Sequence, residues 1–262
     1  MTASYILYDV TARVATITLN RPESLNALVG NMREQIFTCL RAAQADAEVG
    51  CVIITGAGTA FCAGGDIANM IDLQARDDTR PLAERIGVAA ALIEFLMQMD
   101  KPVIAAVNGA AAGAGINLAL ACDFRYGAER AKFAESFVKI GLVPDWGGHY
   151  LLTRLIGTGR AMELMMTGER IDAQEAWRLG IVNHVFANAG FMDEVRRRAE
   201  QLAQGPAAAL AAIKRGVYLG ASATLTDTLA YELQTQTRLF LSADAREGMQ
   251  AFVDKRAPRF GQ

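Results

Sequence analysis

Histidine is scarce in this chain, and its cysteines are scattered. Only two histidines occur, His149 and His184, and neither an H-E-x-x-H nor a G-x-S-x-G motif is present. This argues against a zinc protease and a serine hydrolase. The four cysteines include no C-x-x-C pair, so we expect no metal site and no redox pair. They indicate free thiols in a reducing compartment.

Excess charge is also missing. The formal net charge is -2 and the isoelectric point is about 5.8, so neither nucleic acid nor an anionic membrane is an expected partner. The first ten residues have neither a basic start nor a long apolar run, which predicts no signal peptide and a cytoplasmic protein. The uncharged run from Val103 to Cys122 is rich in Gly and Ala and contains two Asn, which disfavours a membrane span.

Strands and helices are expected to alternate over most of the chain, which favours an α/β fold. Alternating or continuous apolar runs predict strands at Val14–Leu19, Cys51–Thr55 and Val103–Val107. Beyond Phe191 every segment reads as helical. We therefore divide the 262 residues into a core at 1–190 with the active site and a helical region at 191–262.

Three further expectations concern the boundaries of elements. The turn between the first two strands is placed at residues 9–13, and a helix is placed at residues 26–45. Residues 72–80 are charged and poor in apolar side chains, which is typical of an exposed loop. Asp66 is a credible helix start, because Asp side chains cap helix N-termini.

The uncharged run holds the feature around which the chain is organised. We expect a buried strand at Val103–Val107, a glycine-alanine turn at 108–113, and a helix from Ala114 to Cys122. Small side chains allow another backbone or a ligand to approach the main chain. The helix start offers unpaired N–H groups, which can stabilise a developing negative charge on oxygen. A buried strand-turn-helix with no chemistry is the alternative at this point.

A similar unit occurs earlier in the chain. Ile53–Asp66 reads IITGAGTAFCAGGD, and Ala105–Asn117 reads AAVNGAAAGAGIN. The duplication suggests two backbone N–H donors for one oxygen, and the candidates are those of Ala63 and Ala114. The sequence shows two matching loops and not their convergence. The first loop also imitates a dinucleotide-binding turn, but Phe61 occupies the third glycine position of that motif.

Four segments together resemble the crotonase superfamily, the enoyl-CoA hydratase/isomerase family. They read LNRPESLNAL, GAGTAFCAGGDI, KPVIAAVNGAAAGAGINLALACD and KIGLVPDWGG, and the tail reads AFVDKRAPRF. The resemblance spans essentially the whole chain. It implies a crotonase (ClpP-like) spiral of ββα units with a C-terminal helical trimerisation region, assembled as a homotrimer or a dimer of trimers.

The resemblance also implies a substrate and its contacts. The substrate is an acyl-CoA thioester whose oxygen lies between the N–H groups of Ala63 and Ala114, and no further cofactor is expected because CoA is part of the substrate. The acyl group would lie near Phe137 and Trp146. Contacts to CoA are implied for Ser24, Leu25, Ala27, Ala63, Asp66 and Ile67, with Phe252 and Lys255 reaching the nucleotide end from the same or a neighbouring subunit.

The departures from the family pattern bear on the reaction. Hydratases of the family carry two glutamates at positions where this chain has Asn117 and Phe137, and neither can transfer a proton in that role. Asp145 remains, at an alternative position for the working carboxylate. Its surroundings, including Trp146, should exclude water and raise its pKa. A turn in which Asp145 only bonds backbone N–H groups is the alternative. Asn117 would orient substrate or water.

The sequence therefore predicts an acyl-CoA isomerase that uses Asp145 as acid and base. Two alternatives stay open: an enoyl-CoA hydratase, and a non-catalytic CoA-binding relative. The segment ESFVKIGLVPDWGG is most similar to the phenylacetate-pathway branch, which rearranges ring-epoxidised phenylacetyl-CoA. The acyl group and the direction of reaction are left open.

Overall fold

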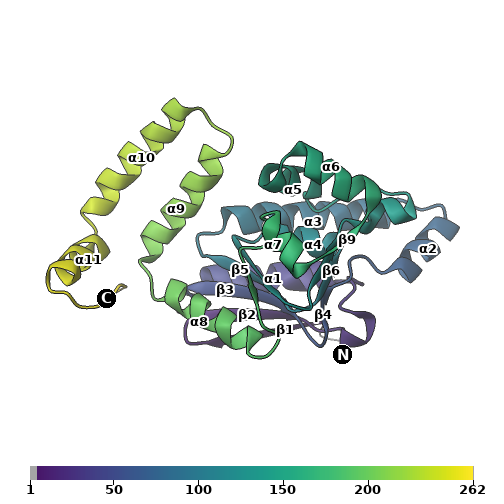
Figure 1. The fold of residues 1–262 in the computed structure, drawn as a ribbon, viewed down its shortest axis with the longest axis horizontal. Coiled ribbons are helices and arrows are strands. Elements are labelled where there is room, and N and C mark those ends of the chain that lie inside the picture. The colour runs from purple at the N-terminus through teal and green to yellow at the C-terminus, as the bar shows by residue number, and fades with distance from the viewer. Residues whose placement is uncertain (1–4, 262) are drawn as a thin grey trace.

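Two β-sheets organise the chain, whose structure is a computed structural model that describes residues 5–261. The larger sheet has six strands in the order β1-β2-β3-β5-β7-β10, and the smaller has four in the order β4-β6-β8-β9. Along the chain, one strand joins the larger sheet, the next joins the smaller, and a helix follows (Figure 1). The predicted α/β spiral of ββα units is confirmed.

The larger sheet begins with an antiparallel hairpin and continues in parallel. Its strands are β1 (Ile6–Thr11), β2 (Val14–Leu19), β3 (Cys51–Gly56), β5 (Val103–Val107), β7 (Phe124–Ala128) and β10 (His184–Phe186). The predicted turn at 9–13 is too long. Ala12 and Arg13 alone form it, with φ of 50° and 65°, because a two-residue turn of this kind matches the twist of the strands.

The smaller sheet was not predicted as such. It consists of β4 (Ala60–Cys62), β6 (Ala110–Ala112), β8 (Lys132–Ala134) and β9 (Arg170–Asp172). Residues expected to form loops supply β4 and β6, which are too short to show a period. Close backbone approach makes the pairing possible: a Cβ on Gly109 would lie 1.9 Å from the Thr59 carbonyl oxygen.

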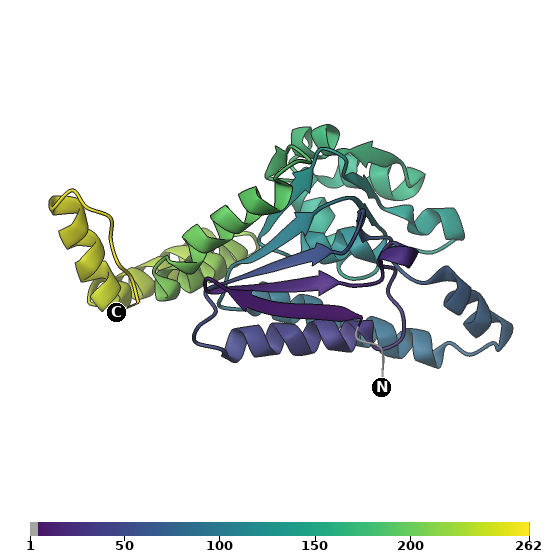
Figure 2. The same cartoon turned by 90° about the horizontal axis from the view of Figure 1, so that it is seen from below.

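Helices cover both faces of the larger sheet (Figures 1 and 2). On one face lie α1 (Met32–Ala45) and α3 (Arg80–Gln98), and on the other lies α8 (Phe191–Ala203). Side chains of β3 alternate between them, since Val52 packs toward α1 and Ile53 toward α8. Helix α4 (Ala114–Leu120) contacts both sheets and is buried throughout.

Two predicted boundaries are wrong. Helix α1 begins at Met32 and not at residue 26, because Leu25 and Asn26 have φ of 49° and 58°, which no right-handed helix accepts. Helix α2 (Ile67–Ala75) extends into the expected loop at 72–80. The predicted start of α2 is confirmed, since the Asp66 side chain accepts a hydrogen bond from the Asn69 N–H.

The remaining helices build the rim of the site and a C-terminal arm. They are η1 (Pro22–Ser24), η2 (Ser136–Ile140), α5 (Gly148–Ile156), α6 (Thr158–Thr167), α7 (Ala173–Arg178), α9 (Ala207–Gly220), α10 (Leu225–Phe240) and α11 (Ala243–Val253). The arm, α9 to α11, projects from the core (Figure 1). Helix α8 packs on the larger sheet. Judged by packing, the arm therefore begins after residue 203. Across residues 5–261, every helix is too short or too polar to span a bilayer.

Candidate active site

The two glycine-alanine loops converge. Strands β4 and β6 pair in parallel, and their exits are packed backbone against backbone. A Cβ on Gly64 would lie 2.8 Å from the Ala112 carbonyl oxygen and 3.5 Å from the Ala114 nitrogen. One on Gly115 would lie 2.2 Å from the Cys62 carbonyl oxygen. Side chains would separate these loops, which explains why small residues occupy both.

The N–H groups at this junction correct one predicted donor. The Ala63 N–H donates to the Leu25 carbonyl oxygen at 2.9 Å, so Ala63 is already engaged. Leu28 bridges the next segment: its N–H donates to Gly64 and its carbonyl accepts from Asp66. Gly65 lies between Gly64 and Asp66. Its N–H is directed away from Leu28 and meets no acceptor among residues 5–261.

Ala114 is the second predicted donor. It is the first residue of α4, and its N–H likewise meets no acceptor within the described part of the chain. Gly65 and Ala114 therefore offer the two open N–H groups at the junction, where the sequence had suggested Ala63 and Ala114. Phe137 borders this point, since its ring would lie 3.7 Å from a Cβ on Gly113.

Arg21 gathers the residues that the resemblance assigns to CoA. Its guanidinium donates to the Ala27 carbonyl oxygen at 2.7 Å, to the Ser24 hydroxyl at 3.2 Å and to the Asp66 carboxylate at 3.3 Å. Leu25 joins the group through its bond to Ala63, and Ile67 follows Asp66 at the start of α2. Arg21 was not among the predicted site residues, although it stands inside the LNRPESLNAL segment.

Phe252 and Lys255 are not brought to this group within one chain. Phe252 lies on α11 with 86% of its surface exposed, and Lys255 follows that helix. Helix α11 lies at the opposite end of the molecule from α2 in both views (Figures 1 and 2). Any contact between these two residues and the site must therefore come from another subunit.

Asp145 lies in the segment between η2 and α5, and its main chain is held by Asn117 of α4. The Asn117 Nδ2 donates to the Asp145 carbonyl oxygen at 2.9 Å. A Cβ on Gly148 would lie 2.5 Å from that Nδ2, so only glycine fits at this start of α5. The Asp145 side chain is half-buried, and its Oδ1 meets no hydrogen-bond donor in the described residues. The sequence alternative, in which this carboxylate caps backbone N–H groups, is not what the structure shows.

Burial raises the pKa of Asp145, and the positive charge of Arg33 opposes that rise. Arg33, on α1, is only 8% exposed, and its Nε and Nη1 have no acceptor among the described residues. Its guanidinium carbon lies 5.8 Å from the centre of the Trp146 ring. Arg33 was not predicted, because in the sequence its place on α1 looks like an ordinary surface position.

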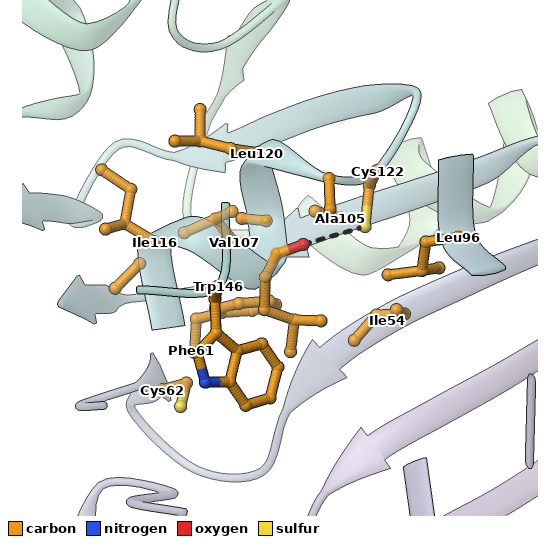
Figure 3. Close-up of a cluster of buried hydrophobic side chains, with 14 of the residues drawn as sticks. Ile54, Phe61, Cys62, Leu96, Ala105, Val107, Ile116, Leu120, Cys122 and Trp146 are labelled. Atoms are coloured by element: carbon orange, nitrogen blue, oxygen red, sulfur yellow. Dashed lines mark hydrogen bonds between the residues drawn. The ribbon is translucent and has the colours of Figure 1, made fainter. Parts of the chain in front are cut away.

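Trp146 anchors the segment that carries Asp145. Its indole is inserted among core side chains that include Phe61, Cys62 and Ile116 (Figure 3). It is 3% exposed and has a φ of 51°, a conformation that costs free energy for a bulky residue. The packing of the ring fixes where Asp145 points. Trp146 thus supports the site from the core, and its contact with the acyl group stays a prediction.

A second carboxyl group, from Glu135, was also missed. Its side chain is 1% exposed, and burial raises its pKa to about 8, with the negative charge of Asp145 adding to the rise and the Asn117 amide opposing it. Asp145, Asn117, Glu135 and Arg33 are called the Asp145 cluster below. The signal in the sequence was an acidic residue at the exit of a short apolar strand.

An apolar cavity of about 610 Å³ lies beside the junction. It is lined by α2, the start of α3 and the segment before Asp145, through Ile67, Met70, Ile71, Leu73, Gln74, Asp77, Asp78, Thr79, Leu82, Ile140 and Leu142. The Met70 sulfur would lie 3.4 Å from a Cβ on Gly65, so one residue of the cavity lining is adjacent to Gly65. Among residues 5–261, no group of three or more His, Cys, Asp or Glu side chains is arranged to hold a metal ion.

Comparison with known proteins gives consistent results. Residues 9–262 match the family described as "Enoyl-CoA hydratase/isomerase". The chain is 41% identical to "Probable enoyl-CoA hydratase" of Rhodobacter capsulatus, with 97% of each chain covered. It is 39% identical to "1,2-epoxyphenylacetyl-CoA isomerase" of Escherichia coli, with 98% of each covered. A crystal structure of an enoyl-CoA hydratase from Polaromonas sp. JS666 has a TM-score of 0.93 and 38% identity, covering 98% of this chain and 99% of that one.

Proposed function

Because this chain belongs to the enoyl-CoA hydratase/isomerase family, we propose that it is an isomerase that moves the double bond of an enoyl-CoA. It is an enzyme that acts on CoA thioesters. The finer assignment rests on one observation. Asp145 is a half-buried carboxyl group with an oxygen that lacks a partner, while the two positions of the usual hydratase glutamates hold Asn117 and Phe137.

In the proposed reaction the thioester oxygen accepts hydrogen bonds from the Gly65 and Ala114 N–H groups. The ionised Asp145 removes a proton from the carbon next to the thioester, and the electron pair of that C–H bond moves onto the thioester oxygen as an enolate. Asp145 then returns the proton to the γ carbon. One such N–H donor is commonly worth about 3 kcal/mol, and general acid-base catalysis about 10²- to 10⁴-fold.

The raised pKa of Asp145 supports this role. Burial makes the carboxylate a stronger base than a solvated one, and the same group must later give the proton back. The neighbouring Arg33 charge limits the rise and so favours the base form. The chemistry needs side chains and backbone N–H groups alone, with CoA as part of the substrate.

The acyl group is proposed to occupy the apolar cavity, and CoA to follow the segment around Ser24, Leu25 and Ala27. The binding of CoA there must displace or share the Leu25 carbonyl oxygen that now accepts from Ala63. Most of the residues that line the cavity are aliphatic and none is aromatic, which suits an aliphatic chain. The relative named 1,2-epoxyphenylacetyl-CoA isomerase is the reason to test a ring-derived acyl group as well.

We further propose a cytoplasmic homotrimer or dimer of trimers. The arm exposes large apolar side chains, among them Leu225, Leu233 and Phe252, and water contact with such a surface is unfavourable. A neighbour would cover this surface, and its arm would carry Phe252 and Lys255 toward the CoA site. Light scattering on the purified protein measures the assembly.

The first experiment offers the protein three substrates in buffered D₂O: a β,γ-enoyl-CoA, an α,β-enoyl-CoA and a 1,2-epoxyphenylacetyl-CoA. Mass spectrometry and ultraviolet absorbance follow the products. Double-bond movement with deuterium uptake, lost in Asp145→Asn, is the expected result. Addition of water would instead make the protein a hydratase, an alternative favoured by the second buried carboxyl group, Glu135. Binding of CoA with no turnover of any substrate would indicate a non-catalytic relative.

A further inference from the structure

Glu135 is a buried carboxyl group that the proposed reaction does not use. It lies between β8 and η2, and neither of its oxygens has a hydrogen-bond partner among residues 5–261. On one side it adjoins apolar residues of α4, β8 and α6, including Ile116, Phe133 and Leu164. On the other it faces the Asn117 amide. An unpaired carboxylate in such surroundings is costly, whereas a neutral acid has a proton to donate.

The Asn117 amide has one acceptor to offer. Its Nδ2 is engaged with the Asp145 carbonyl oxygen at 2.9 Å. Its Oδ1 is fully buried and has no donor among the described residues. A Cβ on Gly148 would lie 2.5 Å from Nδ2 and 2.7 Å from Oδ1, so the backbone of α5 covers one side of the amide and supplies no donor. Glu135 is a neighbour of this amide that can supply a donor once its carboxyl group is protonated.

We propose that Glu135 is a positioning residue which, as a neutral acid, donates its proton to Asn117 Oδ1 and so fixes the amide that holds the Asp145 main chain. The proposal deepens the proposed function and rests on Asp145 acting as described there. In this arrangement one hydrogen bond supplies a partner both to Asn117 Oδ1 and to the protonated oxygen of Glu135. Glu135 touches no reacting atom and acts through Asn117.

Ionisation of Glu135 breaks the arrangement. A carboxylate accepts and cannot donate, so it repels Asn117 Oδ1 and draws Nδ2 away from Asp145. The charged groups that face it are Asp145, whose negative charge opposes ionisation, and the exposed Glu169, which borders the same crevice next to α6. Arg33 faces Asp145 from α1. The pKa of Glu135, raised by burial to about 8, places this break just above neutral pH.

Carbon-13 NMR tests the protonation without relying on activity. Protein carrying glutamate labelled at Cδ should show one carboxyl resonance that titrates with a midpoint near pH 8. The resonance should be missing from Glu135→Gln and from Glu135→Asp, the second variant guarding against poor folding of the first. A Glu135 resonance that titrates near the ordinary glutamate pKa would overturn the proposal, whether or not the protein is an isomerase.

The pH profile of isomerisation tests the coupling to Asp145. Wild type should lose kcat above about pH 8, and Glu135→Gln should not, because the Gln amide keeps a donor and cannot ionise. Glu135→Ala should lower kcat at pH 7 roughly fivefold, the value of one hydrogen bond, with KM little changed. Glu169→Gln is the matched control and should keep the alkaline fall. An alkaline fall that persists in Glu135→Gln contradicts the proposal. Wild type that shows the NMR titration but no isomerisation overturns the proposed function alone.

Discussion

Two carboxylates of this chain have been taken out of water in different ways. Asp123, at the start of β7, accepts hydrogen bonds from the Lys214 ammonium at 2.9 Å, the Val103 N–H at 2.8 Å and the Tyr218 hydroxyl at 3.3 Å. Asp145 has an oxygen with no donor and a countercharge, Arg33, that is itself incompletely bonded. Burial raises the pKa of both; at Asp123 hydrogen bonds from Lys214, Val103 and Tyr218 oppose the rise, whereas at Asp145 the main opposing influence is the charge of Arg33.

The difference separates a structural cluster from a functional one. Asp123, Lys214 and Tyr218, called the Asp123 cluster here, attach α9 to the core, and the Lys214 ammonium also donates to the Leu96 carbonyl oxygen at 2.8 Å. Fully bonded, this cluster has nothing left for a ligand. The Asp145 cluster keeps unsatisfied atoms in a buried place, which is costly for folding and useful for a group that must bind and release a proton.

The largest expected effect is on activity at the Asp145 cluster. Asp145→Asn should lower kcat for isomerisation by about 10²- to 10⁴-fold, because the amide cannot take the proton. The unfolding free energy of the Asp145→Asn variant should stay the same or rise, since an unpaired buried acid is removed. Steady-state kinetics and denaturant unfolding measure the two quantities. Full activity in Asp145→Asn would show that the Asp145 cluster is not the functional one.

The opposite result is expected at the Asp123 cluster. Lys214→Met leaves a buried carboxylate without its cation, and should cost about 3–5 kcal/mol of stability. The kcat per folded molecule should change little. The double variant Lys214→Met/Asp123→Leu is the matched control, since removing both charges should restore most of the loss. A double variant as unstable as the single one would show that packing, and not the ion pair, attaches α9.

Helix α4 connects the Asp145 cluster to the open N–H groups, because Ala114 starts the helix and Asn117 follows within one turn. Ala114→Pro removes one N–H at a helix position that tolerates proline. We expect a loss of about 10²-fold in kcat. Ala243→Pro makes the same change at the first residue of α11, which is exposed, and should leave kcat unchanged. Equal kinetics for the two variants would exclude Ala114 N–H from the site.

The sequence predicted some parts of this site and not others, for physical reasons. Continuous apolar runs revealed β3 and β5, and the absence of other carboxylates at the family positions drew attention to Asp145. Which N–H is free depends on the hydrogen bonds that Leu28 makes with Gly64 and Asp66. The identities of the residues do not reveal this pairing. Hence Ala63 was chosen where Gly65 is open.

The missed charges have a related explanation. Glu135 and Arg33 lie in segments whose charged residues are mostly solvated. The sequence does not show whether a charged residue is buried or exposed. Only the packing of α1, α4 and η2 around Asp145 brings the two inside. Short strands such as β4 and β6 were missed because three residues cannot display a period of two.

The smallest expected effect concerns Arg33, and it tests whether the incomplete bonding of the Asp145 cluster tunes the base. The Arg33 charge holds the pKa of Asp145 below the value that burial alone would give. Arg33→Met should therefore raise this pKa, so that the base form is lost at a higher pH as the solution is acidified. The acid limb of the kcat profile should move to higher pH, with a few-fold loss on the acid side of the profile and almost none on its alkaline side. Arg41→Met, on the same helix, is the control, because Arg41 packs on Phe37 and does not reach Asp145. An acid limb that stays in place in Arg33→Met would mean that Asp145 is tuned by burial alone, and that the unsatisfied donors of Arg33 serve another purpose.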